Sequence, residues 1–255
     1  MNRERADFLG CPVDNLSIEQ AVAKLEEFIH EGTPHHVAVI NANKLWLMER
    51  NPNVAEAVRA ASLIVPEKAI VIGSRILGLG IDHHVGGIML LKAFLPRAEE
   101  NGYRLYFLGA NREVLEQMIC TLRPIYPRLQ IVGGHHGYLS SADNLGVINE
   151  ILQLHPDALF VAMGSPKQEF WIAKNLLQLG VPVCMGVGGS FDVLAGKKKD
   201  TPDWVRALSM EWFYRLVQDP TNLWRRYLIT IPWFLRKVLR ARAQKSFPGI
   251  RHEQR

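Results

Sequence analysis

Short runs of apolar, β-branched or aromatic residues recur along the middle of the chain and alternate with segments of helical periodicity. Each apolar run is continuous, which is typical of parallel strands that are covered on both faces. Runs that alternate with helices in this way predict repeated βα units and a Rossmann-like parallel sheet. The strands are expected at 103–109, 129–134, 158–164 and 182–189, and the helices at 112–122, 142–154 and 167–179.

Two further patterns lie upstream, and the chain changes character near residue 202. Residues 36–43 predict a strand that leads into a helix over 45–50. Residues 62–78 predict a short strand, a turn and a helix that begins near Lys68. After Pro202 the pattern becomes helical, basic and rich in tryptophan. We therefore expect an α/β core over 1–202, with helices on both faces of its sheet, and a basic helical appendage over 203–255.

Composition narrows the class of protein. The 255 residues are 48% hydrophobic and 22% charged, which is ordinary for a globular chain. The formal net charge is +5, but the segment after Pro202 holds eleven Lys or Arg against four Asp or Glu, so this segment carries +7 and the rest of the chain carries −2.

Three widely separated cysteines predict neither a disulfide framework nor a zinc ribbon, so a cytoplasmic protein is expected. We expect neither a signal peptide nor a membrane span, which needs roughly 18 to 20 apolar residues.

Glycine-rich turns follow three of the predicted strands, at the edge where open α/β sheets bind their ligands. Glycine permits a close approach of the backbone, and amide groups at a helix N-terminus suit a phosphate. The alternative is that each glycine merely ends its strand. Three such turns at one edge favour a nucleotide site, although none is a P-loop or a complete dinucleotide fingerprint. The turns are Gly109-Ala110-Asn111, 164–169 and 186–192.

The turn at 164–169 contains the side chains that are best suited to bind a ligand. Ser165 is expected to cap the next helix, with Pro166 in the first turn, so that Lys167 and Gln168 project from the helix N-terminus. A cation and an amide in that position could hold a diphosphate. A capping turn with charged residues and no ligand is the simpler alternative.

Candidate catalytic and sugar-binding side chains follow the two upstream strands. Glu67 comes directly after its strand, where a carboxylate could act as a general base, although a surface Glu is commoner than a catalytic one. Asn41 and Asn43 could hydrogen-bond a sugar or shape a turn. Three pairs of adjacent histidines lack the spacing of metal ligands, so neither a metal nor a cofactor is expected.

The basic segment after Pro202 is interleaved with tryptophans and long aliphatic residues. This mixture suits an anionic membrane surface, and nucleic acid is the other partner that it allows. Seven apolar residues favour the membrane over nucleic acid: Leu228, Ile229, Ile231, Phe234, Leu235, Val238 and Leu239. A buried helical core remains the alternative for the part before Leu223. The residues expected at the membrane are Arg215, Trp224, Arg225, Arg226 and Trp233, with further charge from Arg206, Arg236, Lys237, Arg240 and Arg242.

Several of these segments together resemble the WecG/TagA/CpsF bacterial glycosyltransferases, glycosyltransferase family 26. The resemblance covers about residues 35–230. The matching segments are ALFVAMGSPKQEFWI (158–172), GVGGSFDVLAG (186–196), EWFYRLVQDPTNLWRRYL (211–228), GGHHGYL (133–139), YRLYFLGAN (103–111) and VINANKLWLMERNP (39–52).

The resemblance implies an inverting, metal-independent transferase. Such an enzyme moves a sugar from a UDP donor to an undecaprenyl-diphosphate-linked saccharide at the inner face of the cytoplasmic membrane, where it would be peripheral. The C-terminal segment of family members is thought to reach the membrane and help close the active site. The resemblance also implies that the protein can form a homo-oligomer.

Carried over by position, the resemblance assigns roles to individual residues. The family's catalytic aspartate falls on Glu67, its arginine on His84, and its Arg-Ala-Pro on Asp200-Thr201-Pro202. The implied catalytic residues are Glu67 and Gln168, and the implied substrate-binding residues are Asn41, Asn43, His84, Gly109, Asn111, Tyr138, Gly164, Ser165, Pro166, Lys167, Gly188, Gly189, Phe191 and Asp192. The positions at which this sequence differs from the family motifs cluster around the expected sugar site. We therefore prefer UDP-glucose as the donor. The alternatives are UDP-N-acetylmannosamine or its uronic acid as donor, and a non-catalytic UDP-sugar-binding subunit.

Overall fold

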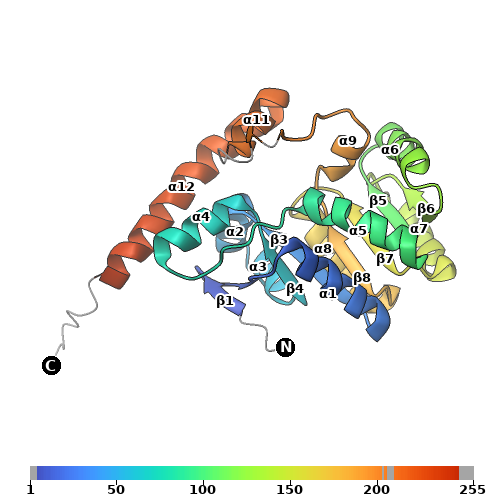
Figure 1. The fold of residues 1–255 in the computed structure, drawn as a ribbon, viewed down its shortest axis with the longest axis horizontal. Helices are drawn as coiled ribbons and strands as arrows, with labels where there is room; N and C mark the ends of the chain where they lie inside the picture. Colours follow the sequence, from blue (N-terminus) through green and yellow to red (C-terminus); the bar gives the residue numbers. More distant parts are fainter. Residues whose placement is uncertain (1–4, 203, 206–209, 247–255) are drawn as a thin grey trace.

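A six-stranded, fully parallel sheet forms the centre of the protein, in a computed structural model that describes residues 5–202, 204–205 and 210–246 (Figure 1). The strand order is β4-β3-β8-β7-β5-β6, so strands far apart in the sequence lie side by side. Its strands are β3 (His35–Ile40), β4 (Leu63–Pro66), β5 (Arg104–Gly109), β6 (Gln130–His135), β7 (Ala158–Ala162) and β8 (Val183–Gly186).

Helices cover both faces of this sheet, which confirms the predicted α/β fold. One face packs against α1 (Ile18–Glu31), α5 (Gly87–Asn101), α6 (Arg112–Ile125) and the short α9 (Ser190–Leu194). The other packs against α2 (Ala42–Arg50), α3 (Pro52–Arg59), α4 (Lys68–Leu77), α7 (Ser141–Leu154) and α8 (Lys167–Leu179). Successive residues of β5 therefore enter different cores: Phe107 joins the first face, while Tyr106 and Leu108 join the second. Burial on both faces explains why the strands read as continuous apolar runs.

A small hairpin of β1 (Arg5–Phe8) and β2 (Cys11–Asp14) lies beside the edge strand β4. The buried carboxylate of Asp14 accepts the Ile64 N–H at 2.7 Å and pairs with Arg5 at 2.9 Å. Neither this hairpin nor α1, α3 and α5 was predicted from the sequence. The hairpin strands have four residues each and contain charges and Pro12, so they carry no clear alternation, whereas α1 did have a readable signal in the Ser17–Gln20 capping box.

The basic C-terminal segment is helical as predicted, and it forms α11 (Glu211–Gln218) and the long α12 (Pro220–Ser246). Figure 1 shows α12 running alongside α4 and α2. Three residues at four-residue spacing, Thr230, Phe234 and Val238, are buried on this side of α12. Phe234 stacks on Phe8 of the N-terminal hairpin, with ring centroids 6.1 Å apart. Contrary to our expectation of a membrane-facing surface, Phe234 and Val238 are therefore part of the protein core.

The outer side of α12 and much of α11 keep the exposed apolar character that the sequence indicated. Leu228, Ile229, Leu235 and Leu239 are each about half exposed or more, as is Val217 of α11. No residue of α11 is buried, so the alternative of a buried core before Leu223 does not apply to that helix. Arg206 lies outside the described residues. None of the described helices is long and apolar enough to cross a membrane.

The contact between α12 and the core predicts opposite effects of the same substitution in two helices. A Cβ at the buried Gly73 of α4 would lie 2.6 Å from Phe8 Cζ and 3.0 Å from Phe234 Cζ, whereas one at the exposed Gly146 of α7 meets no atom within 4 Å. Gly73→Ala should lower the free energy of unfolding by about 1–3 kcal/mol through overpacking. Gly146→Ala, the matched control, should raise it by about 0.5–1 kcal/mol because alanine is the better helix former. Urea denaturation measures both, and a Gly73→Ala variant as stable as the wild type would contradict this packing.

Candidate active site

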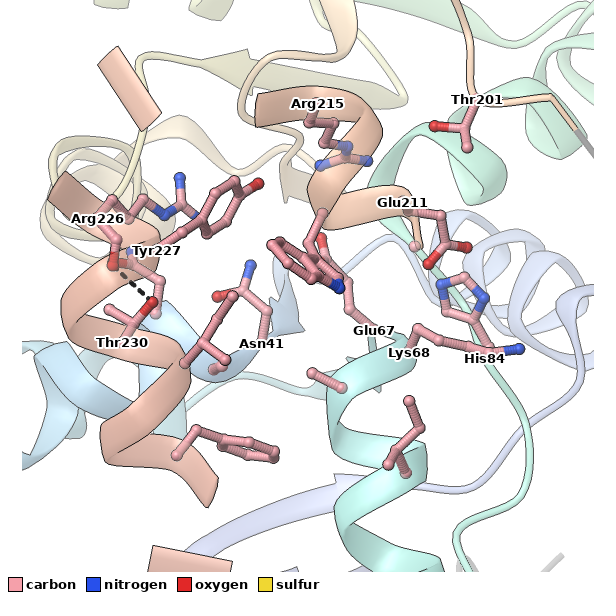
Figure 2. Close-up of a pocket in the computed structure, with 18 of the residues that line it drawn as sticks. Asn41, Glu67, Lys68, His84, Thr201, Glu211, Arg215, Arg226, Tyr227 and Thr230 are labelled. Atoms are coloured by element: carbon pink, nitrogen blue, oxygen red, sulfur yellow. Dashed lines mark hydrogen bonds between the residues drawn. The ribbon is translucent and has the colours of Figure 1, made fainter. Parts of the chain in front are cut away.

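Two adjoining hollows open at the carboxyl edge of the sheet, with volumes of about 240 Å³ and 210 Å³. Together we call them the cleft. The first hollow lies over α4 and includes Lys68, His84 and Glu211 (Figure 2). The second lies over the ends of β7 and β8 and includes Lys44, Gln168 and Gly188. Eight residues line both hollows, which are therefore continuous: Asn41, Glu67, Ile88, Asp200, Thr201, Arg215, Arg226 and Tyr227.

Glu67 stands where the two hollows meet. Its backbone N–H donates to the carbonyl of Ile40 at 2.9 Å, which fixes the end of β4 to the end of β3. Glu67 occupies the N-cap position of α4, but its side chain makes no capping hydrogen bond. The half-buried carboxylate is therefore not occupied by the helix end and lies in the cleft.

Asn41 faces Glu67 from the end of the neighbouring strand (Figure 2). Its side-chain oxygen caps α2 by accepting the Lys44 N–H at 2.9 Å, a bond in which the amide nitrogen takes no part. Asn43 lies two residues further along and lines the first hollow. The capping and sugar-binding interpretations of Asn41 are thus compatible, because they use different atoms of one side chain.

The turn between β7 and α8 forms one wall of the second hollow through Gly164, Ser165 and Gln168. Contrary to expectation, Ser165 does not cap α8: the cap position is Pro166, after a cis peptide bond, and no side chain caps this helix end. The Ser165 hydroxyl instead donates to Glu169 Oε1 at 3.1 Å. Gly164 has φ +75°, a conformation that glycine adopts without strain.

Gln168 is buried and held between two elements. Its Nε2 donates to Glu169 Oε1 at 2.9 Å, and its Oε1 accepts the N–H of Gly188 at 3.0 Å. The side chain also lies directly over Gly186, where a Cβ would come within 2.6 Å of Nε2. Gln168 therefore joins the α8 turn to the loop after β8, and it lines the second hollow from this fixed position.

The C-terminal helices close the cleft from above. Arg215 of α11 and Arg226 and Tyr227 of α12 face Glu67 and Asn41 across it (Figure 2). Burial raises the pKa of Tyr227; the charges of Arg215 and Arg226 oppose this shift and that of Glu67 adds to it. Among the described residues that line the second hollow, five are Lys or Arg and three are Asp or Glu. Glu169 neutralises Lys44 from outside the lining, and the other four cations still outnumber the three carboxylates, so the hollow suits an anion.

The first hollow has a more mixed character. Figure 2 shows the carboxylate of Glu211 and the imidazole of His84 facing each other at one side of it. Asp200 pairs with Lys92 at 2.6 Å at the border of the two hollows. Glu67, His84 and Asp200, where the resemblance led us to expect departures from the family motifs, line the same hollow.

Several residues that we expected at the site lie away from the cleft. Phe191 is fully buried, and its ring packs edge-on against Phe107 with centroids 5.6 Å apart, so its side chain cannot contact a ligand there. Gly109 is needed for packing, because a Cβ would lie 2.5 Å from the Ala162 carbonyl carbon. Asn111 caps α6, and Tyr138 is 75% exposed. Other predicted residues that line neither hollow are Pro166, Lys167, Asp192, Trp224, Arg225 and Trp233, whereas Gly189 lines the second hollow as expected of a site residue.

Lys44, Lys198, Glu211 and Tyr227 line the cleft although we assigned none of them a role. Lys198 pairs with Asp219 at 2.9 Å. Lys44 had one signal in the sequence, a charged residue among the apolar positions of a helix that follows a buried strand. The other three come from the segment after β8, whose position over the sheet only tertiary structure gives. Across the described ranges, no group of three or more His, Cys, Asp or Glu side chains is placed to hold a metal ion.

The arrangement suits the transfer of a group between two bound molecules. The carboxylate of Glu67 lies where the second hollow, whose cations suit a phosphorylated leaving group, adjoins the first hollow, which can admit an attacking hydroxyl. A carboxylate at the junction of the two hollows is in the position that a general base for such a transfer requires.

Comparison with known proteins identifies the family of the chain. The chain matches the model of the "Glycosyl transferase WecG/TagA/CpsF family" over residues 6–247. It is 34% identical over 244 residues to proteins of Staphylococcus aureus strains MW2 and NCTC 8325 / PS 47, each named N-acetylglucosaminyldiphosphoundecaprenol N-acetyl-beta-D-mannosaminyltransferase. These alignments cover 94% of this chain and 94% of each relative, so they include both the sheet and α12. The chain therefore belongs to the WecG/TagA/CpsF family of glycosyltransferases.

Proposed function

We propose that the protein transfers N-acetylmannosamine from a UDP donor to N-acetylglucosaminyl-diphospho-undecaprenol. The observation that carries the proposal is the position of Glu67 between the two hollows of the cleft. The names of the Staphylococcus aureus relatives support the acceptor and the transferred sugar. The cation-rich lining of the second hollow supports a diphosphate-containing donor.

The donor sugar differs from our first expectation. The departures at His84 and Asp200 led us to prefer glucose, but the relatives' printed activity is N-acetylmannosaminyl transfer, which was our alternative. Both departures line the first hollow, and Asp200 also borders the second, so they can alter contacts to sugar or acceptor without removing Glu67. The uronic acid of N-acetylmannosamine is the alternative sugar, and a transfer assay with the corresponding UDP-sugar tests it.

The proposed reaction is a single displacement. Glu67 takes the proton of the acceptor hydroxyl while that oxygen attacks the anomeric carbon, and the bond from that carbon to the UDP oxygen breaks on the opposite face. An α-linked donor then gives a β-linked product, in keeping with the β-mannosaminyl activity in the relatives' names. In this scheme Asn41 and Asn43 orient the sugar, and no metal takes part.

The departing UDP needs its growing negative charge stabilised. Arg215 and Arg226 line both hollows, and Lys198 lies in the second, so they surround the expected position of the diphosphate. The N-terminal turn of α8 adds a favourable dipole from the other wall. Fixed cations and dipoles in a closed site are an effective way to stabilise such charge.

We further propose that the segment after Pro202 is a membrane-associating appendage on the inner face of the cell membrane. The exposed apolar residues of α12 lie among the exposed Arg225, Arg236 and Arg240, a combination that suits an anionic lipid surface. The same helix contributes Arg226 to the cleft, so membrane contact and donor binding share one element.

Glu67→Gln should keep the affinity for UDP and lower turnover by about 10²-fold or more, because it removes the base and keeps the shape. The measurement combines isothermal titration with UDP and a transfer assay with purified lipid acceptor. Near-normal turnover of this variant would remove Glu67 from the proposed role.

Neighbouring arginines of α12 provide a matched pair. Arg226 lines both hollows, whereas the exposed Arg225 lines neither. Arg226→Ala should lower kcat/KM for the donor about tenfold or more, the scale of a lost hydrogen bond to a charged group. Arg225→Ala should stay within about twofold in neutral detergent with a short-chain acceptor, because surface charges away from a site contribute little. Equal losses in the two variants would contradict the assignment of Arg226 to the donor.

The donor itself is tested with the wild-type chain and radiolabelled UDP-sugars. We expect label from UDP-N-acetylmannosamine to enter N-acetylglucosaminyl-diphospho-undecaprenol, and no transfer from UDP-glucose. The matching ligand should also raise the melting temperature, because it binds the folded state alone. Thermal stabilisation without transfer from any UDP-sugar would favour the non-catalytic binding subunit instead.

A further inference from the structure

Below the second hollow, Lys44 and Glu169 form an ion pair that the proposed reaction does not use. Lys44 Nζ lies 2.7 Å from Glu169 Oε1, and the two side chains are only 3% and 1% exposed. Lys44 belongs to the first turn of α2, after β3, and Glu169 to the first turn of α8, after β7. Because β3 and β7 are the two neighbours of β8 in the sheet, the pair spans the end of β8.

Glu169 Oε1 is the common acceptor of three donors. Besides Lys44 Nζ, it accepts Gln168 Nε2 at 2.9 Å and the Ser165 hydroxyl at 3.1 Å. Gln168 in turn accepts the N–H of Gly188 in the loop after β8. One carboxylate oxygen thus connects the turns after β3, β7 and β8, and four of the connected residues line the second hollow: Lys44, Ser165, Gln168 and Gly188.

The charges of this pair cancel within the protein. Burial pushes the pKa of Glu169 upward, but the Lys44 charge and the hydrogen bonds from Lys44, Gln168 and Ser165 hold it below its ordinary value. Burial lowers the pKa of the adjacent His36 to about 4, with Lys44 acting in the same direction, so its imidazole is neutral at neutral pH. The pair therefore adds no net charge at the second hollow.

A buried ion pair of this kind does not by itself stabilise a fold, because desolvation of two charges offsets their attraction. Apolar side chains of similar size are often as stable or more so. Glu169 Oε2, moreover, is buried without a hydrogen-bond partner among the described residues, which adds to the cost. Stability alone thus gives a poor account of why the pair occupies this place.

We propose that Lys44 and Glu169 are positioning residues for the donor diphosphate, and that they act by holding Ser165, Gln168 and the Gly188 loop in fixed relative positions. This inference rests on the proposed function, since it takes the second hollow as the site of the diphosphate. Neither residue needs to touch the donor. Their contribution is to preorganise groups that do, which lowers the cost of ordering them on binding.

The test replaces both charges at once. In Lys44→Met/Glu169→Met neither charge is left unpaired, so we expect the melting temperature to stay within about 3 °C of the wild type. The common acceptor is lost, however, so UDP should bind about tenfold more weakly or worse and kcat/KM for the donor should fall with it, since small displacements in a site are costly. KM for the lipid acceptor should not change. Amide hydrogen exchange at Gly188 should become faster.

A matched control is the ion pair of Arg97 and Glu26, which joins α5 to α1 at 3.0 Å and lines neither hollow. Arg97→Met/Glu26→Met should leave UDP affinity unchanged. Lys44→Leu/Glu169→Leu gives a second apolar pair should the methionine variant fold poorly, with the same expected result.

Wild-type UDP affinity in either folded apolar variant would overturn the positioning role and leave the proposed function intact. A wild-type chain that binds no UDP would overturn both. A loss of affinity that appears equally in the Arg97 and Glu26 control would also overturn the inference, because it would show a general effect of removing ion pairs.

Discussion

The parallel sheet is buried by helices on both faces, and this constraint determines where the chemistry of the protein can lie. The strand interiors have no room for polar side chains that lack partners, so polar groups gather where the strands end. Asn41, Glu67, Gln168 and Gly188 all follow strand ends on the same edge. The cleft is thus a consequence of strand direction.

The sheet edge alone gives only part of the cleft. The remaining wall comes from α11 and α12, which bring Arg215, Arg226 and Tyr227 over the strand ends (Figure 2). The packing of Phe234 on Phe8 and Gly73 holds α12 in that place. An apolar contact between the first strand and the last helix therefore positions Arg226, which lies about two turns before Phe234 in α12, over the edge of the sheet.

Most of the sheet was predictable because burial on both faces leaves a local signature in the sequence. Strands β5 to β8 and helices α6 to α8 follow the expected runs within a few residues. Elements without such a signature were missed, as in the hairpin β1–β2, where four-residue strands depend on the pairing of Asp14 with β4. A helix that contains proline, such as α5 with Pro96, likewise departs from simple local rules.

The position of a residue at the cleft was predictable where it follows a strand end, as for Glu67 and for Gly164, Ser165 and Gln168 of the turn at 164–169. The site was not predictable where the same type of residue can serve either core packing or ligand binding. Gly109 allows a close approach to Ala162, and Phe191 fills the core, although either could have faced a ligand. Phe234 and Val238 show the same ambiguity, because an apolar helical face suits a protein core and a lipid surface equally well. Tertiary contacts alone separate these cases.

The stacking of Phe234 on Phe8 also bears on how the protein is made. Chains emerge from the ribosome with the N-terminus first, so the hairpin and the whole sheet are available before α12 is complete. Until residue 234 has been added, the stacking contact that helps to hold Arg226 and Tyr227 above the strand ends cannot form. A nascent chain can therefore hold the folded sheet and the ends of its strands while the cleft still lacks the wall that α11 and α12 form.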